Sequence, residues 1–219
     1  MEGFARHVAE AVTDSMDDVL ERLAQVAPST LGHFLDEGFL DPGIRPLYRP
    51  IRLVGRAFTV SSPPRDNGIL RRAIREARSG DVLVISRAGD VRHAAFGGLL
   101  GLAAKQRGIA GVVLDGPATD RAEIAELRFP VFARGISALT TRRLDIGGTV
   151  GEPITCGGVR VATGDYVLGD DDGVLIIAAA DVESVVARGL EAGRREGETR
   201  RHLLAGKTLD EIDELRRGT

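Results

Sequence analysis

Two short segments hold the residues best suited to chemistry, and the first is Phe96-Gly97-Gly98-Leu99-Leu100-Gly101. It opens a predicted helix, and the first turn of a helix presents N–H groups that have no acceptor within the helix. Glycine lets the backbone approach a ligand closely, and the helix dipole favours a phosphate or a carboxylate at this end. The same glycines also suit a tight turn with close helix packing. The spacing is not that of a G-x-G-x-x-G dinucleotide motif.

The second segment, Asp115-Gly116-Pro117-Ala118-Thr119-Asp120, follows an apolar run at 111–114 that we expect to be a buried strand. Ligands of parallel α/β sheets bind beyond the carboxyl ends of the strands. Two carboxylates five positions apart, on a loop restrained by Gly and Pro, suit a hard cation such as Mg²⁺. The alternative is structural, with Asp115 forming a turn and Asp120 capping a helix at 121–127.

Other candidate residues favour structural roles. Asp170-Asp171-Asp172 lies between two glycines without the spacing of an EF-hand, which indicates a strand–turn–strand corner. His33 and His93 have no partner at metal-ligand spacing. Cys156 is the single cysteine, so it forms no intrachain disulfide, and we expect it to be a small buried residue.

Strands and helices must hold these two segments in place, and the hydrophobic pattern predicts that they form an α/β fold. Strand-like and helix-like segments alternate, which implies parallel pairing with right-handed crossovers. The predicted strands are 52–60, 82–86, 111–114 and 130–133, with helices near 69–77, 99–107 and 121–127. Residues 149–178 are rich in strands and predict a β-meander or small barrel packed on the α/β part. Helices are expected at 5–26, 181–204 and 210–217.

The chain length of 219 residues suits a single domain. We predict one domain over 1–219, with an N-terminal helix in 1–28, a core in 29–178 and C-terminal helices in 179–219. The net charge of −3 gives no general attraction to nucleic acid. No apolar run approaches the roughly 20 residues that span a membrane, and we find no secretory signal. We therefore expect a cytoplasmic protein without nucleic-acid or membrane partners.

At its two motifs the chain resembles the 4-hydroxy-4-methyl-2-oxoglutarate aldolase / regulator of ribonuclease activity A family. That family typically shows Gly-(Glu/Asp/Gly)-x-x-x-x-x-Ala, followed by Gly-x-x-Gly-x-Val-x-Asp-Gly-x-x-Arg-Asp. The stretches Gly97–Ala104 and Gly108–Asp120 fit this pattern, and Gly157–Asp165 with Asp170–Val174 fits a later run. The likeness extends over roughly residues 29–206.

The resemblance implies a compact α/β/β sandwich, similar to a swivelling domain, that assembles into a homotrimer or homohexamer. It implies Mg²⁺ or Mn²⁺ at Asp120, held largely through water, and a pyruvate moiety bound at Gly97, Gly98, Leu99 and Leu100. The expected activity is that of a divalent-metal-dependent aldolase or decarboxylase. Such a carbon–carbon lyase cleaves 4-hydroxy-2-oxo acids or oxaloacetate to pyruvate through a metal-stabilised enolate.

The chain departs from the family pattern at two positions. Thr119 stands where the family has an arginine that would bind a substrate carboxylate, and Gly98 stands where an acidic residue is frequent. We expect Thr119 to line the substrate site, and Arg121 or Arg92 to supply the missing charge, so Asp120 and Arg121 are the predicted catalytic residues. Two alternatives stay open: a non-enzymatic binding protein resembling a ribonuclease inhibitor, and a related lyase with a different small anionic substrate.

Overall fold

The computed structural model describes residues 18–217, which form two compact units. One unit comprises residues 18–34 and 183–217, and the other comprises residues 35–182. Of the predicted N-terminal helix at 5–26, residues 18–23 are helical, and the earlier part lies outside the described residues. The larger unit holds both motifs.

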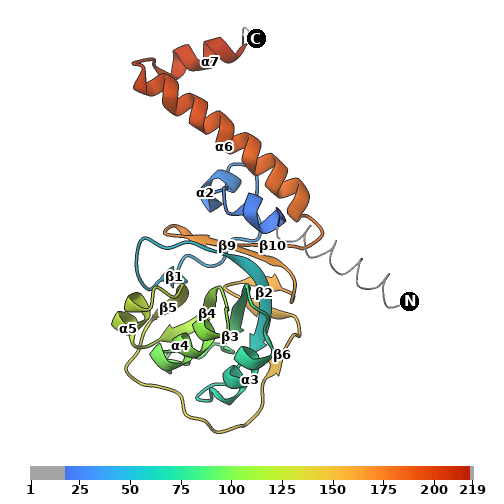
Figure 1. The fold of residues 1–219 in the computed structure, drawn as a ribbon, viewed down its shortest axis with the longest axis vertical. Helices are drawn as coiled ribbons and strands as arrows, with labels where there is room; N and C mark the ends of the chain where they lie inside the picture. Colours follow the sequence, from blue (N-terminus) through green and yellow to red (C-terminus); the bar gives the residue numbers. More distant parts are fainter. Residues whose placement is uncertain (1–17, 218–219) are drawn as a thin grey trace, which may run out of the picture. The chain divides into compact units, whose positions relative to one another are not determined.

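The larger unit is built on one mixed sheet (Figure 1). Its centre is parallel, with β2 pairing β3, β3 pairing β4 and β4 pairing β5. The outer strands run antiparallel to their neighbours. In spatial order the strands are β1 (Arg45–Pro46), β5 (Val131–Ile136), β4 (Gly111–Ala118), β3 (Asp81–Ser86), β2 (Leu53–Ser61), β9 (Tyr166–Asp170) and β10 (Gly173–Ile177), and β6 (Thr149–Val150) also pairs with β2.

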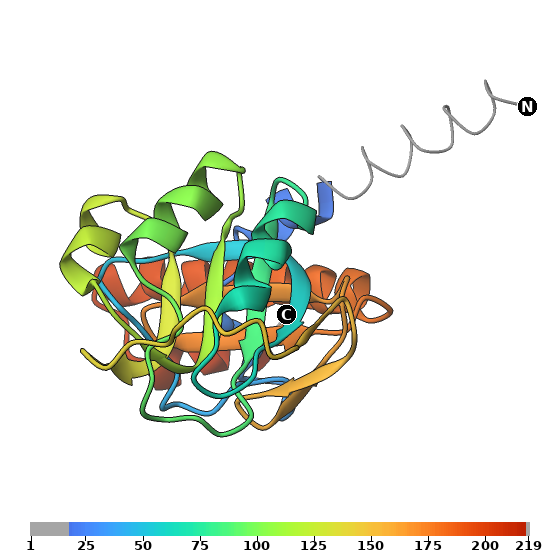
Figure 2. The same ribbon diagram turned by 90° about the horizontal axis from the view of Figure 1, so that it is seen from below.

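Layers cover both faces of this sheet, as the predicted α/β/β sandwich requires. Helices α3 (Gly68–Glu76), α4 (Gly98–Gln106) and α5 (Arg121–Glu126) lie on one face (Figure 2). The hairpin of β7 (Ile154–Cys156) and β8 (Val159–Val161) lies on the other. Alternate residues of β3 divide between the two cores, because Leu83 packs with the helices and Val84 packs with the hairpin. The α/β class is confirmed.

The C-terminal strands differ from the prediction of a separate meander or barrel. Strand β9 pairs with β2 from Leu53↔Gly169 to Arg56↔Tyr166, so β9 and β10 extend the main sheet. Within residues 18–217, only β7 and β8 form a separate two-stranded element. The second edge of β2 would otherwise leave its N–H and C=O groups unpaired, and β9 satisfies them.

The segment 115–120 also differs from the predicted loop. Strand β4 continues through Ala118, so only Thr119 and Asp120 connect it to α5. Asp115 lies within the strand and pairs with Ser86. Two other predictions are confirmed: β9 and β10 form the expected corner around Asp171 and Asp172, and Cys156 is fully buried.

The smaller unit is helical. It contains α2 (Pro28–Leu31), α7 (Leu209–Arg217) and nearly all of α6 (Val182–Leu204). Arg22 donates to Glu183 at 2.7 Å, and the Arg188 guanidinium lies 4.1 Å from the centre of the Phe34 ring. None of the helices in residues 18–217 has the length and apolar character needed to cross a bilayer.

Candidate active site

The two motifs meet at the start of α4. Phe96, which is fully buried, forms a parallel bridge with Ala118 at the end of β4. The Thr119 N–H donates to the Phe96 carbonyl at 2.9 Å. Gly97 follows in an extended conformation as the N-cap residue of α4, and the first bond of that helix runs from Gly101 N to Gly97 O. The end of β4 is thereby fixed beside the first turn of α4.

Asp120 joins these two segments through its side chain. Its Oδ2 accepts the Gly98 N–H at 3.0 Å, and its Oδ1 accepts the Thr119 hydroxyl at 3.1 Å. Asp120 occupies the N-cap position of α5, but its carboxylate does not cap that helix. Its backbone is left-handed (φ 54°), a conformation that Asp tolerates better than most residues. The predicted residues Gly97, Gly98, Thr119 and Asp120 are therefore neighbours.

Gly97 is required here by close approach. A Cβ atom on it would lie 2.4 Å from Asp120 Oδ2 and 2.6 Å from the Thr119 methyl carbon. Any larger residue at this position would displace the Asp120 carboxylate from the helix start.

Glu123 also borders this site, although no motif in the sequence points to it. A Cβ atom on Gly98 would lie 2.0 Å from Glu123 Oε2, so the carboxylate occupies the space that a side chain at residue 98 would need. The available signal was a spacing of three residues from Asp120 on a helix, which places Glu123 on the same side of α5. Asp120 and Glu123 therefore both border Gly98.

Asp115, the other carboxylate of the predicted pair, has a structural role. It forms an ion pair with Arg134 and accepts the Gly157 N–H at 2.8 Å. Asp115 thereby connects β4 to β5 and to the turn between β7 and β8. In residues 18–217 no group of three or more His, Cys, Asp or Glu side chains is placed to hold a metal. The carboxylates available at the site are Asp120 and Glu123.

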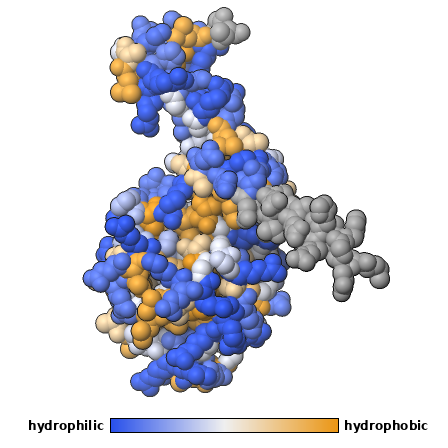
Figure 3. Space-filling view, in the orientation of Figure 1, coloured by the Kyte–Doolittle hydropathy of each residue, from blue (hydrophilic) through white to orange (hydrophobic). Residues whose placement is uncertain are grey.

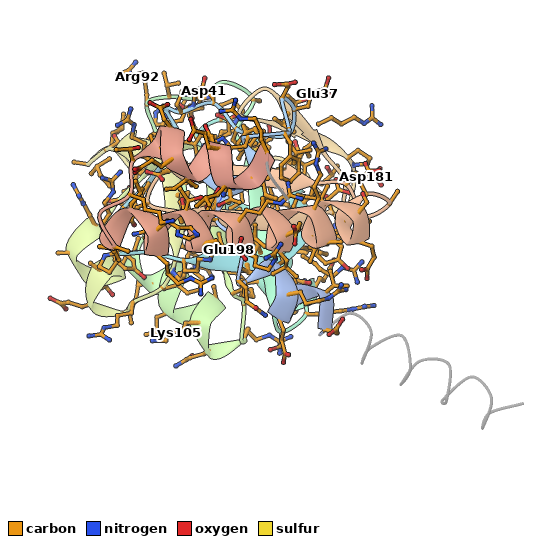
Figure 4. All side chains as sticks on the ribbon, turned by 90° about the horizontal axis from the view of Figure 1, so that it is seen from above. Glu37, Asp41, Arg92, Lys105, Asp181 and Glu198 are labelled. Carbon is orange, nitrogen blue, oxygen red and sulfur yellow. The ribbon has the colours of Figure 1, made fainter. Side chains whose placement is uncertain are left out.

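The remaining predicted residues lie at different distances from this centre. Leu99 is 80% exposed, whereas Leu100 is partly buried and packs against the helical side of the core. Arg121 Nε donates to the Leu47 carbonyl at 2.5 Å, and this side chain lines a separate cavity. Arg92 is exposed on a surface loop (Figure 4). Lys105 donates to the Leu127 carbonyl at 2.6 Å and lies at the far end of α4.

A buried arginine connects the loops that follow β2 and β3. Arg87 is fully buried, and its Nη1 donates to the Ser62 hydroxyl at 2.6 Å and to the Asp66 carbonyl at 3.0 Å. Its Nη2 lies 3.3 Å from Asp90 Oδ2. Burial raises the pKa of Asp90, but hydrogen bonds from Arg92 and His93 outweigh it and hold that pKa well below its usual range.

The carboxylates of Asp120 and Glu123 beside Gly98 are suitable ligands for a cation such as Mg²⁺. Mg²⁺ is usually bound by one or two carboxylates and keeps several waters, so it does not require a cage of protein ligands. Asp120 and Glu123 offer two carboxylates, and each carboxylate oxygen can accept more than one contact. The hydrogen bonds from Gly98 and Thr119 would orient the Asp120 carboxylate in the way that outer-shell groups orient metal ligands.

The fold and this site define a class of α/β/β proteins in which a glycine-rich helix start meets an aspartate after a central parallel strand. The chain belongs to the RraA-like family, described as Aldolase/RraA, whose model matches residues 12–176.

Individual relatives carry two kinds of name. A protein of Halalkalibacterium halodurans, provisionally named 4-hydroxy-4-methyl-2-oxoglutarate aldolase, is 39% identical over 145 residues, which cover 66% of this chain and 69% of the relative. The solved structure of Streptomyces coelicolor RraAS2, titled an unusual member of the RNase ES inhibitor RraA family, is similar with a TM-score of 0.74. It is 25% identical, covering 84% of this chain and 96% of its own. An uncharacterized protein from Pseudomonas syringae has a TM-score of 0.80 and 26% identity, covering 91% and 94%.

Proposed function

We propose that this protein is a divalent-metal-dependent carbon–carbon lyase that releases pyruvate from 4-hydroxy-2-oxo acids or from oxaloacetate. One observation carries the proposal: the Asp120 carboxylate is fixed at the first turn of α4 by Gly98 and Thr119. The aldolase name of the 39% identical relative supports the same reaction class.

In this proposal, the residues that bind the metal differ from those that bind the substrate. Asp120 and Glu123 hold the cation, Asp120 as its anchor and Glu123 through direct or water-mediated contact. Mg²⁺ or Mn²⁺, when bound, supplies a Lewis acid that stabilises the negative charge developing on the 2-keto oxygen as the carbon–carbon bond breaks.

The substrate carboxylate is received by the helix start. The N–H groups of Leu99 and Leu100 belong to the first turn of α4, where no intrahelical acceptor is available, and the helix dipole favours an anion there. Because Gly98 N–H is already donated to Asp120, these two amides are the ones we assign to the substrate.

A pyruvate-release assay with 4-hydroxy-4-methyl-2-oxoglutarate and with oxaloacetate tests the proposal. We expect turnover with Mg²⁺ or Mn²⁺ that is abolished by EDTA and restored by excess metal. If neither substrate releases pyruvate above the uncatalysed rate with metal present, the proposal is wrong.

A second function is favoured by Thr119. The arginine that the resemblance places at this position is missing, so the site lacks a fixed positive charge for the substrate. The similar protein RraAS2 is named as an unusual member of an RNase ES inhibitor family, and a binding protein would not need that charge. Inhibition of a purified ribonuclease E-type enzyme by the protein, together with no pyruvate release, would support this second function. Activity on another small anionic 2-oxo acid would instead indicate a related lyase.

We further propose a homotrimer or homohexamer in the cytoplasm. Several large apolar side chains of the larger unit are exposed, among them Leu99, Val91 and Ile146 at 80%, 69% and 61%. In the proposed assembly, contacts between subunits cover these side chains. Sedimentation at micromolar concentration should give a mass three or six times 23.3 kDa. A monomer alone would contradict the assembly.

A further inference from the structure

One cavity of the larger unit is lined by four arginines. It measures about 360 Å³ and lies beside β1 and the end of β5. Its cationic side chains are Arg45, Arg49, Arg121 and Arg134. Figure 3 shows hydrophilic side chains over much of one face, and the chain as a whole has 29 basic and 32 acidic residues. Four arginines around one cavity with few acidic partners therefore require an explanation.

Three of these arginines are held by uncharged acceptors. Arg45 Nε donates to the Pro42 carbonyl at 3.0 Å, Arg49 Nη2 donates to the Asp171 carbonyl at 2.9 Å, and Arg121 Nε donates to the Leu47 carbonyl. Main-chain carbonyls orient a guanidinium without neutralising it. Each side chain is fixed through one nitrogen, and a guanidinium has five N–H donors, so donors are left for a ligand.

Arg134 differs, because acidic residues already neutralise it. It pairs with Asp115 and lies 3.3 Å from Asp41 Oδ2. The Asp171 carboxylate is also engaged, since its Oδ1 accepts the Ile51 N–H at 2.9 Å. Within residues 18–217, carboxylates form salt bridges with Arg134, but none forms a salt bridge with Arg45, Arg49 or Arg121. The positive charge of these three is therefore available to a ligand.

We propose that this arginine cavity, defined by Arg45, Arg49, Arg121 and Arg134, binds a small organic polyanion that carries at least two phosphate or carboxylate groups. Guanidinium groups bind both of these anions through paired N–H donors. Arg45, Arg49 and Arg121 carry three positive charges without a carboxylate partner, so one monovalent anion would leave most of that charge uncompensated. The volume lies within the usual range of small-molecule sites.

This cavity is separate from the candidate active site. Neither Gly98 nor Asp120 lines the cavity. Its charged side chains are arginines, whereas those of the candidate active site are the carboxylates of Asp120 and Glu123. Arg121 nevertheless follows Asp120 directly and begins α5, so a ligand held by Arg121 contacts the residue next to the proposed metal anchor. The binding proposal does not depend on the lyase activity.

Isothermal titration of the full chain without metal tests the proposal, with pyrophosphate and citrate as polyanions and acetate as a monovalent comparison. We expect saturable binding of pyrophosphate or citrate at one site per chain, and much weaker binding of acetate. Which of the two polyanions binds more tightly distinguishes a phosphate ligand from a carboxylate ligand. Arg45→Gln and Arg49→Gln should each weaken binding about tenfold.

Two controls distinguish this site from others. Arg71→Gln removes an exposed arginine from α3, outside the cavity, and should leave binding unchanged. Asp120→Asn should also retain binding, because the proposed lyase site is not involved. Thermal unfolding checks that each variant is folded, and Arg49→Lys, which keeps the charge but loses the fork geometry, should give a smaller loss than Arg49→Gln.

The proposal is overturned if neither polyanion binds saturably, or if Arg45→Gln and Arg49→Gln bind as well as wild type. It is also overturned if Arg71→Gln weakens binding as much as they do, which would indicate a general charge effect. Loss of binding in Asp120→Asn alone would place the probe at the other site.

Discussion

Asp120 Oδ2 accepts the Gly98 N–H at 3.0 Å, although the two residues are 22 positions apart in the chain. This bond places a carboxylate where the helix dipole of α4 favours negative charge. It also uses the first free amide of that helix, so in the proposed mechanism a substrate anion would bind to the next two. The relationship determines how variants at the site should behave.

Asp120→Asn should abolish metal-dependent pyruvate release while the fold survives. Asn accepts the left-handed backbone of residue 120 at least as readily as Asp, so the change removes the charge without adding the strain that Ala would add. The checks are pyruvate release against Mg²⁺ concentration and thermal unfolding. Asp172→Asn, in the turn between β9 and β10, is the matched control and should keep wild-type turnover. Full Mg²⁺-dependent turnover in Asp120→Asn would refute the metal assignment.

Glu123→Gln should weaken Mg²⁺ binding by about 10–100-fold, the usual cost of losing a supporting group at a metal site. The physical reason is that its carboxylate fills the space above Gly98 beside Asp120. Titration of Mg²⁺ in the activity assay measures the effect. The double variant Gly98→Asp with Glu123→Ala moves the carboxylate to residue 98. It should bind Mg²⁺ more tightly than Glu123→Ala alone. Unchanged metal dependence in Glu123→Gln would exclude Glu123 from the site.

Thr119→Arg should raise kcat/KM for both proposed substrates by about one to two decades, if a charge-assisted contact of about 1.5–3 kcal/mol is restored. The change also removes the hydroxyl that donates to Asp120 Oδ1. Thr119→Val, which removes only that hydroxyl, separates the two effects. A fast wild type that gains nothing from arginine would mean that another group already binds the carboxylate, and Arg121→Ala and Arg92→Ala then identify it.

Gly97→Ala and Gly101→Ala should have opposite effects on stability. The methyl group at residue 97 would lie 2.4 Å from Asp120 Oδ2 and must displace it, whereas at residue 101 the nearest atom is 3.7 Å away. Gly101→Ala should therefore raise the free energy of unfolding by about 0.5–1 kcal/mol through helix propensity. Urea denaturation measures both. Equal stability of the two variants would contradict the close approach at residue 97.

Acid should destabilise the protein through Asp90. Its pKa is lowered in the folded state, so below about pH 4, near the unfolded value of about 3.9, the unfolded chain binds a proton that the folded chain does not. Stability from this group is present above that range and is lost as the pH falls toward the folded pKa. Asp90→Asn should be less stable at pH 7 but should lose less between pH 7 and pH 3. Parallel pH profiles of the two proteins in urea denaturation would contradict this.

The sequence by itself determined the class of the fold and, within the site, the helix start at Gly97-Gly98. Hydrophobic runs such as Val82–Ile85 mark buried strands, and Gly97-Gly98 before an apolar helical pattern marks a helix start, because backbone preferences and burial are local properties. The alternation of strands and helices was enough to predict the parallel centre of the sheet.

Only the tertiary structure decided which side chains meet. Asp115 and Asp120 look equivalent in the sequence, yet Asp115 is bound by Arg134 and Asp120 by Gly98. Glu123 could not be identified from the sequence, because its carboxylate fills the space that a side chain at residue 98 would occupy, and no sequence pattern shows that contact. The arginine cavity could not be predicted either, because Arg45 and Arg121 are far apart in the chain and the pairing of β1 with β5 helps to bring their surroundings together. Contacts between distant residues depend on the packing of the whole unit, and no local pattern encodes them.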